Sequence, residues 1–217
     1  MSLLLPNKQK IMIIGIDFDN TIVSYDKLFY REAMQLGLID AQCLKNKTSV
    51  RDHIRKTWGD VAWQKLQALV YGPKIGEAVL IPGVKEFLST CKKHKIKVFI
   101  VSHKTEYANY DPTRTNLRLA ALQWLDDHDF FSDHDFGLKR EVFFFESNRL
   151  DKISRIKNLC CTLYIDDLEE IFLDESFDQN IDKILFAPNS TWEIDGIKVC
   201  TSWKSITEYV FRECGKD

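Results

Sequence analysis

Two aspartates one residue apart, Asp17 and Asp19, directly follow a short apolar segment near the start of the chain. The segment, residues 13–16, is rich in β-branched side chains, which is typical of a buried strand. Residues i and i+2 of an extended segment point to the same side, so the two carboxylates would share one small space. Carboxylates that close repel each other unless a cation neutralises them or one of them holds a proton. A hard divalent ion such as Mg²⁺ would meet the first condition, because it prefers oxygen ligands.

The aspartate pair by itself also fits other interpretations. Solvated turn residues after a strand have this pattern, and so does the Asp-x-Asp of a glycosyltransferase, which holds a metal and a nucleotide sugar. Asn20 follows the pair. Asparagine tolerates a left-handed backbone, so the chain is expected to turn out of the sheet here. The downstream sequence has to distinguish these alternatives.

Polar residues also end two later apolar segments. Ser102 lies near the end of the segment 97–103, and Asp166 and Asp167 follow the segment 162–165. Strands that alternate with helices predict a parallel sheet with helices on both faces. Sheets of this kind bind ligands at the carboxyl ends of their strands. The sequence therefore predicts one site at that edge, formed by the ends of three strands.

The helices that position these strand ends are predicted from apolar spacing and from start and stop residues. The expected N-caps are Thr48 or Ser49 for the second helix, Asp60 for the third, and Thr113 or Thr115 for the fifth. The expected helices cover residues 26–37, 48–58, 60–71, 84–94, 113–125, 150–159 and 203–213. Further short strands are expected at residues 142–145, 184–187 and 197–200.

The segment 22–79 has helical patterns and no strand signal, and Pro82-Gly83 then begins a new helix. We therefore predict two parts. Residues 1–21 and 80–217 form an α/β core, a Rossmann-like parallel sheet flanked by helices. Residues 22–79 form an all-helical cap inserted after the first strand.

With these elements in place, the chain resembles the haloacid dehalogenase (HAD) superfamily of phosphohydrolases over nearly its whole length. The resemblance is carried by residues that match the four motifs of the family in order, namely Asp17-Phe18-Asp19-Asn20-Thr21, Ser102, Lys152 and Asp166-Asp167. Lys139 is a rival for the third motif. Lys152 is preferred because it lies one helix before the fourth-motif strand, although it lacks the Lys-Pro often seen in the family. The segment 22–79 is similar to the smaller, helical type of cap in this family.

The resemblance implies a Mg²⁺-dependent phosphohydrolase that forms an aspartyl-phosphate on Asp17 and uses Asp19 as acid and base. It implies that Mg²⁺ is held by Asp17, by the backbone carbonyl of Asp19 and by Asp166, with Asp167 beside it. The residues expected to contact the substrate phosphate are Asn20, Thr21, Ser102, His103 and Lys152. A small helical cap implies a small phosphorylated metabolite as the substrate, with sugar phosphates among the candidates.

Four alternatives stay open or are disfavoured. A phosphomutase or a phosphonatase would use the same core, and a phosphonatase needs a cap lysine that forms a Schiff base. No context favours one of the cap lysines Lys27, Lys45, Lys47, Lys56 and Lys65. A non-catalytic phosphate-binding module is disfavoured because both motif-one aspartates are intact. A receiver domain of a signalling relay is disfavoured because its lysine would follow the phosphoacceptor strand.

Composition limits the partners. The chain has 217 residues and a formal net charge of −2, so no overall positive charge favours nucleic acid or an anionic membrane as a partner. The apolar run near Met1 is too short for a signal peptide, and no run approaches the ~20 residues of a membrane span. The six cysteines lack zinc-ligand spacing and are expected to be reduced thiols in a cytoplasmic protein. The oligomeric state is left open.

Overall fold

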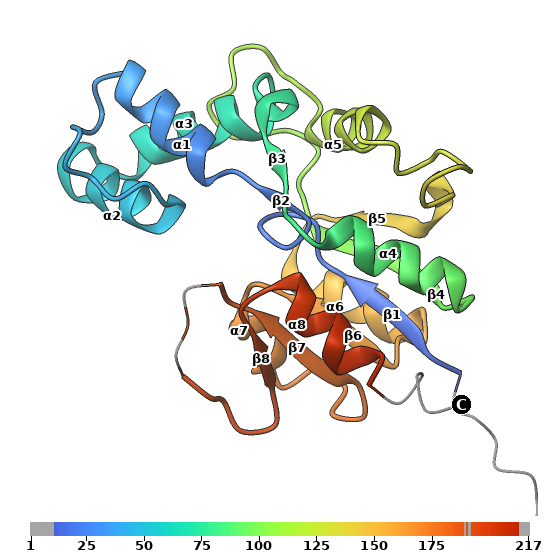
Figure 1. The fold of residues 1–217 in the computed structure, drawn as a ribbon. Coiled ribbons are helices and arrows are strands. Elements are labelled where there is room, and N and C mark those ends of the chain that lie inside the picture. The colour runs from blue at the N-terminus through green and yellow to red at the C-terminus, as the bar shows by residue number, and fades with distance from the viewer. Residues whose placement is uncertain (1–10, 189, 191, 213–217) are drawn as a thin grey trace, which may run out of the picture.

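The computed structural model describes residues 11–188, 190 and 192–212. A six-stranded sheet, in the order β5-β4-β1-β6-β7-β8, forms its centre, and all neighbouring strands are parallel (Figure 1). The strands are β1 (Ile13–Ile16), β4 (Lys97–His103), β5 (Phe143–Glu146), β6 (Leu163–Asp166), β7 (Asp182–Phe186) and β8 (Lys198–Cys200). The predicted α/β fold class is confirmed.

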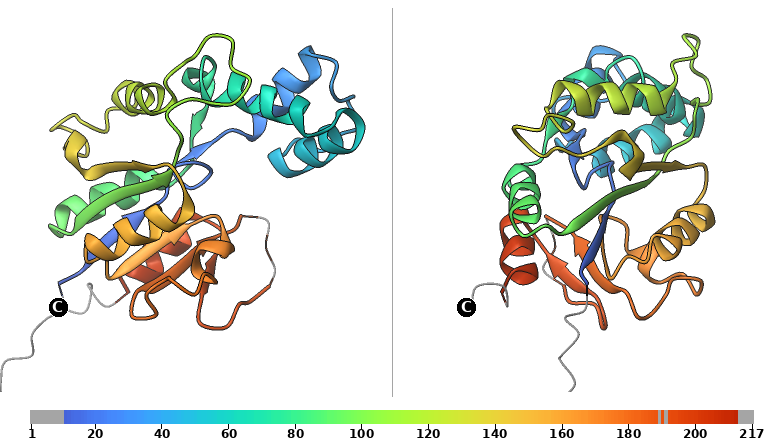
Figure 2. Two further views of the ribbon diagram at one scale, coloured as in Figure 1. Left: turned by 180° about the vertical axis from the view of Figure 1, so that it is seen from behind. Right: turned by 90° about the vertical axis from the view of Figure 1, so that its right-hand side faces the viewer.

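Helices cover both faces of this sheet, as the right-hand view of Figure 2 shows. Two buried apolar clusters correspond to the two faces, and alternate residues of β4 belong to different clusters. Val98 and Ile100 pack with α4 and α8, whereas Phe99 and Val101 pack with α6 and α7. The helices of the core are α4 (Val84–Lys93), α5 (Leu117–Asp127), α6 (Arg149–Asn158), α7 (Glu169–Phe172) and α8 (Trp203–Val210).

The register of the three central strands sets the place of the candidate site. Ile16, the last residue of β1, pairs with Ile100 of β4 on one side and with Ile165 of β6 on the other. The backbone N–H of Asp17 then donates to the carbonyl of Ile165 at 2.9 Å. Asp17 therefore lies level with Asp166 at the carboxyl end of β6, and β4 ends only two residues further along.

The segment between β1 and α4 contains three helices that lie apart from the sheet in Figure 1. They are α1 (Asp26–Gln35), α2 (Lys47–Trp58) and α3 (Asp60–Tyr71), followed by the 3₁₀ helix η1 (Ile75–Glu77). Two short strands that the sequence pattern does not predict, β2 (Val23–Ser24) and β3 (Val79–Leu80), pair in antiparallel fashion where the segment leaves and rejoins the core. Two residues are too few for an alternating pattern, which is why no strand signal is visible. The division into a core and a cap stays a prediction.

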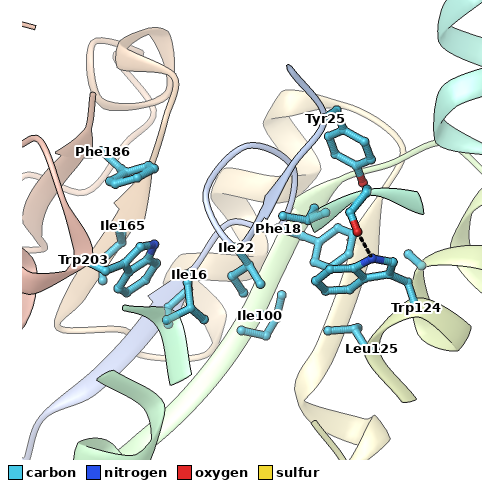
Figure 3. Close-up of a cluster of buried hydrophobic side chains, with 14 of the residues drawn as sticks. Ile16, Phe18, Ile22, Tyr25, Ile100, Trp124, Leu125, Ile165, Phe186 and Trp203 are labelled. Carbon is cyan, nitrogen blue, oxygen red and sulfur yellow. Dashed lines mark hydrogen bonds between the residues drawn. The ribbon is translucent and has the colours of Figure 1, made fainter. Parts of the chain in front are cut away.

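Two tryptophans of the core donate hydrogen bonds to these two connections. The indole N–H of Trp203 donates to the carbonyl of Thr21 at 2.8 Å, and that of Trp124 donates to the carbonyl of Ala78 at 3.1 Å. Figure 3 shows both rings in one apolar cluster with the end of β1 and with Phe18. The segment that carries α1–α3 is thus hydrogen-bonded to the core near the points where it leaves and rejoins it.

The predicted helices and strands are observed with modest shifts, but the predicted N-caps are wrong. Asn46 caps α2 by accepting from the N–H of Ser49, and Asn116 caps α5. Gly59 precedes α3, so Asp60 is its first helical residue rather than its cap. Asn46 lies upstream of the two predicted caps of α2, and Asn116 lies downstream of the two predicted caps of α5. Each has the extended backbone that lets the side-chain oxygen reach the free N–H groups.

A few ends also differ. The short 3₁₀ helix η2 (Arg140–Val142) precedes β5, which begins one residue later than expected. The last helix, α8, ends at Val210, and the predicted end at residue 213 lies outside the described residues. Within the described ranges, no helix is long and apolar enough to cross a membrane.

Candidate active site

A buried lysine connects two of the predicted strand ends. The ammonium of Lys152 lies 2.6 Å from Oδ1 of Asp17 and 2.6 Å from Oδ2 of Asp166. Lys152 is in the first turn of α6, which begins where the side chain of Asn148 accepts from the N–H of Asp151. The rival Lys139 is exposed and is not among the residues that line the cavity at this site. The structure therefore places Lys152 beside the aspartates.

Three carboxylates gather at the same point. Asp17, Asp166 and Asp167 each offer an oxygen, and these three oxygens lie within 4.8 Å of one another. Asp166 is fully buried and is also held by the N–H of Leu168, which donates to its Oδ1 at 2.9 Å. Hard oxygen donors in this number fit a divalent cation such as Mg²⁺. These are the side chains that could hold such an ion.

Burial and mutual repulsion shift the pKa values of this cluster. Burial raises the pKa of Asp17 to about 7 against the opposing effect of Lys152, and the charges of Asp166 and Asp19 also raise it. Burial also raises the pKa of Asp167 well above its usual range, and Asp166 and Asp17 add to this. Burial disfavours the ammonium of Lys152, but Asp166 and Asp17 overcome it and raise the lysine pKa. One lysine thus leaves excess negative charge that a proton or a cation would relieve.

Ser102 brings an unused hydroxyl to this cluster. Its side chain is buried, and its Oγ has no hydrogen-bond partner among the described residues. A buried hydroxyl without a partner costs free energy, so an oxygen-rich group bound in front of it would be stabilised. His103, the next residue, also lines the cavity, but its ring is exposed and its Nε2 lies 3.1 Å from the carbonyl oxygen of Ser147.

Asn20 and Thr21, the last two residues of the first motif, point to different places. Asn20 has a φ of 61°, as expected for a residue that turns the chain out of the sheet, and it lines the cavity. Thr21 is buried, and its Oγ1 lies 3.5 Å from Oδ1 of Asp167. Thr21 is not among the residues that line the cavity.

The cavity lies between the ends of the strands and the helices α2 and α3. Its volume is about 390 Å³. The carboxyl ends of the strands form its floor, and the opposite wall is polar, with Lys47 from α2 and Gln64, Gln67 and Tyr71 from α3. The loop after β4 forms a third wall, where Asn109 donates to Gln64 at 3.3 Å.

Comparisons with known proteins identify the fold. No family model matches the sequence, and a search of curated proteins finds no match either. Solved structures do share the fold. A HAD family hydrolase from Deinococcus radiodurans R1, with bound phosphate and sodium, is 12% identical, with a TM-score of 0.54 over 92% of this chain and 95% of that chain. A HAD-superfamily hydrolase, subfamily IA, variant 1, from Geobacter sulfurreducens PCA is also 12% identical, with a TM-score of 0.53 over 92% and 100%. A HAD hydrolase, family IA, variant 3, from Entamoeba histolytica HM-1:IMSS is 13% identical, with a TM-score of 0.52 over 89% and 94%.

This chain has the fold of the HAD-superfamily hydrolases. The resemblance drawn from the four motifs is thereby confirmed at the level of the fold. At these identities the match supports the fold alone, and both the type of cap and the roles of the motif residues stay predictions. The residues of the four motifs come from the ends of the neighbouring strands β4, β1 and β6 and from α6, and they lie around one cavity.

The motif analysis missed further polar residues of this HAD-fold site. Lys104 lies two residues after Ser102, and its ammonium is 2.9 Å from Oδ2 of Asp19. Strand alternation from Ser102 could have drawn attention to Lys104. Tyr25 donates its hydroxyl to Oδ1 of Asp19 at 2.6 Å, and Lys47 reaches the cavity from α2. No local sequence signal identifies these two.

Proposed function

We propose that this HAD-fold chain is a metal-dependent phosphohydrolase that cleaves a small phosphomonoester through an aspartyl-phosphate on Asp17. One observation carries the proposal, namely the buried ammonium of Lys152 at 2.6 Å from both Asp17 and Asp166, at the end of a cavity that Ser102 also lines. Phosphoryl transfer depends mainly on positioning and on charge stabilisation, and this cluster supplies both.

The metal would be held by Asp17, Asp166 and Asp167, whose oxygens already lie together, and by the backbone carbonyl of Asp19. When bound, Mg²⁺ would offset the repulsion between the nucleophilic carboxylate and the phosphoryl oxygens. The Deinococcus neighbour, which carries phosphate and sodium, supports an oxyanion and a cation in this fold. Magnesium is preferred because the donors are hard oxygen atoms.

The residues of the chain account for the two chemical steps. In the first, a carboxylate oxygen of Asp17 attacks phosphorus, the bond from phosphorus to the leaving oxygen breaks, and Asp19 gives that oxygen a proton. In the second, Asp19 takes a proton from water, whose oxygen attacks phosphorus and releases phosphate from Asp17. The hydroxyl of Ser102 and the ammonium of Lys152 donate to phosphoryl oxygens in both steps.

The leaving group would face the polar wall of the cavity. Gln64, Gln67 and Asn109 offer amide donors and acceptors, and the ammonium of Lys47 lies 5.6 Å from the centre of the Tyr71 ring. Amides of this kind match a hydroxyl-bearing leaving group such as a sugar. The volume of about 390 Å³ is in the range of small-molecule sites. We therefore propose a small phosphorylated metabolite as the substrate, rather than nucleic acid or a membrane component.

A phosphate-release screen across small phosphomonoesters tests this function. We expect turnover of at least one hydroxyl-bearing phosphomonoester with Mg²⁺, loss of turnover in excess chelator, and recovery when Mg²⁺ is returned. Asp17→Asn is the matched inactive control, since it keeps the size of the side chain. Full activity in excess chelator would contradict the metal-dependent mechanism.

A phosphonatase is the second candidate, because Lys47 lines the cavity whereas Lys27, Lys45, Lys56 and Lys65 do not. The screen should therefore include a phosphonate with an aldehyde on the neighbouring carbon. Inactivation by borohydride only in the presence of that phosphonate would indicate a Schiff base and would favour this candidate.

A further inference from the structure

We propose that Lys104 and Tyr25 are positioning residues that hold the carboxylate of Asp19 for proton transfer to and from the leaving group. The inference rests on the proposed phosphohydrolase function and assigns two residues that lie outside the four motifs. It is carried by the contacts of Asp19, by the burial of its two partners, and by the elements from which they come.

Both donors converge on one carboxylate. The ammonium of Lys104 lies 2.9 Å from Oδ2 and 3.1 Å from Oδ1 of Asp19. The hydroxyl of Tyr25 donates to Oδ1 at 2.6 Å. Since a carboxylate oxygen has two lone pairs, Oδ2 keeps room for a proton after accepting from Lys104. The side chain of Asp19 is 18% exposed, so it still faces the cavity.

The ammonium of Lys104 is buried, so it needs a partner of opposite charge. Its side chain is only 2% exposed, and its ammonium lies over the rings of Phe18 and Tyr71, 5.5 Å and 5.2 Å from the two ring centres. A buried charge is costly unless it is paired, and Asp19 is the carboxylate that pairs with it. The contact therefore fixes both partners.

The backbone of Lys104 is fixed as well. Its N–H donates to the carbonyl of Glu146 at 2.8 Å, and its carbonyl accepts from Nε of Arg118 at 3.0 Å. Glu146 is the last residue of β5, so the position of Lys104 is set by the edge of the sheet. A lysine anchored in this way can hold the carboxylate in one orientation.

Tyr25, at the start of the cap segment, contacts the carboxylate of Asp19 at Oδ1. It is the residue directly before α1, it is fully buried, and its ring meets that of Tyr71 of α3 edge-on at 4.8 Å. Asp19 is thus held between the sheet edge and the helices that line the opposite wall. A general acid or base must be oriented to act, and this arrangement supplies the orientation.

The dependence of the rate on the leaving group separates positioning from mere structural support. An alkyl phosphate needs a proton on its departing oxygen, whereas p-nitrophenyl phosphate releases a stable phenolate and needs little help. Because kcat/KM reports the step in which the leaving group departs, Lys104→Met should lower kcat/KM for the alkyl phosphate by about 10²-fold, the lower end of the usual contribution of acid catalysis. For the aryl phosphate the loss should be at least several-fold smaller. Lys104→Arg, which keeps a positive donor, should recover part of the loss.

Tyr25→Phe provides a milder second variant, because it removes a single hydroxyl. It should show the same preference for the aryl phosphate with a smaller loss, and it keeps the test decisive if Lys104→Met does not fold. In an Asp19→Asn background, Lys104→Met should have no further effect on kcat/KM, since both changes act through one group. Circular dichroism and thermal melting check the fold of each variant.

Two outcomes would overturn the assignment. One is an equal loss of kcat/KM for alkyl and aryl phosphates in Lys104→Met and Tyr25→Phe. The other is a full additional loss from Lys104→Met in the Asp19→Asn background. Either result with an active wild type would leave the proposed phosphohydrolase function standing. A wild type that releases phosphate from no substrate would overturn both.

Discussion

Replacing Lys152 with methionine should both destabilise the fold and stop catalysis. The side chain of Lys152 is 2% exposed, and its two partners, Asp17 and Asp166, are 5% and 0% exposed. Methionine fills nearly the same volume, so the change removes the charge without a large cavity. Removal of one partner from a buried ion pair typically costs about 3–5 kcal/mol, because the remaining charge stays buried and unpaired. We expect a loss of this size in the free energy of unfolding, measured without divalent cations.

The same variant should respond more strongly to a cation. Without Lys152, the carboxylates of Asp17, Asp166 and Asp167 have no ammonium between them, so a bound Mg²⁺ relieves more repulsion than in the wild type. A ligand present at 100 times its dissociation constant stabilises by about 2.7 kcal/mol. Mg²⁺ should therefore raise the free energy of unfolding of Lys152→Met by more than it raises that of the wild type.

Urea unfolding followed by circular dichroism, with and without Mg²⁺, measures both effects. Lys139→Met is the matched control, since Lys139 is exposed and the change should stay within about 0.5 kcal/mol. In activity, Lys152→Met should lose about 3–4 kcal/mol of transition-state stabilisation, as for the loss of one charge-stabilising donor, and Lys139→Met should be near neutral. A Lys152→Met protein as stable as the wild type in chelator, or a reversed pattern of activity between the two lysines, would refute this reasoning.

Three further predictions concern the nucleophile, pH and substrate size. Asp17→Asn should lose both turnover and covalent phosphate. Asp19→Asn should turn over so slowly that acid quenching traps phosphate on Asp17. A near wild-type kcat in Asp17→Asn would place the nucleophile elsewhere. Burial raises the pKa of Asp17 from 3.8 to about 7, so this group favours the folded state below about pH 4 and loses that contribution as the pH rises through about 7. In chelator the melting temperature should therefore fall between about pH 4 and pH 7, less so in Asp17→Asn, and Mg²⁺ should restore it at the higher pH. A wild-type decline no larger than that of Asp17→Asn would contradict this linkage. Phosphopeptides and phosphorylated oligonucleotides should have a kcat/KM well below that of the best small phosphomonoester, because the cavity between the sheet and α2–α3 has a volume of only about 390 Å³. The opposite order of kcat/KM values would contradict a site closed by these helices.

The sequence by itself determined the elements and the residues at their ends. Alternation and apolar runs are local properties, so they located β1, β4 and β6 and the polar residues that follow them, including Asp17 and Asp166. The order of strands and helices also predicted the parallel sheet. Local signals were weaker for the N-caps, because neighbouring Asn, Ser and Thr side chains compete and the backbone conformation decides which one accepts, as at Asn46 and Asn116.

Only the tertiary structure decided which side chains meet. Lys152 and Asp17 are 135 positions apart, and Lys104 and Asp19 are 85 positions apart, yet both pairs are in direct contact. No periodicity encodes such distances, because they follow from the parallel register of β1 with β4 and β6 and from the point at which α6 begins. Tyr25, at the start of the cap segment, reaches Asp19 only because the chain turns sharply after β1, where Asn20 adopts a left-handed backbone. The local pattern thus identifies the acidic residues and the resemblance selects Lys152, whereas only long-range packing brings Lys104 and Tyr25 to Asp19.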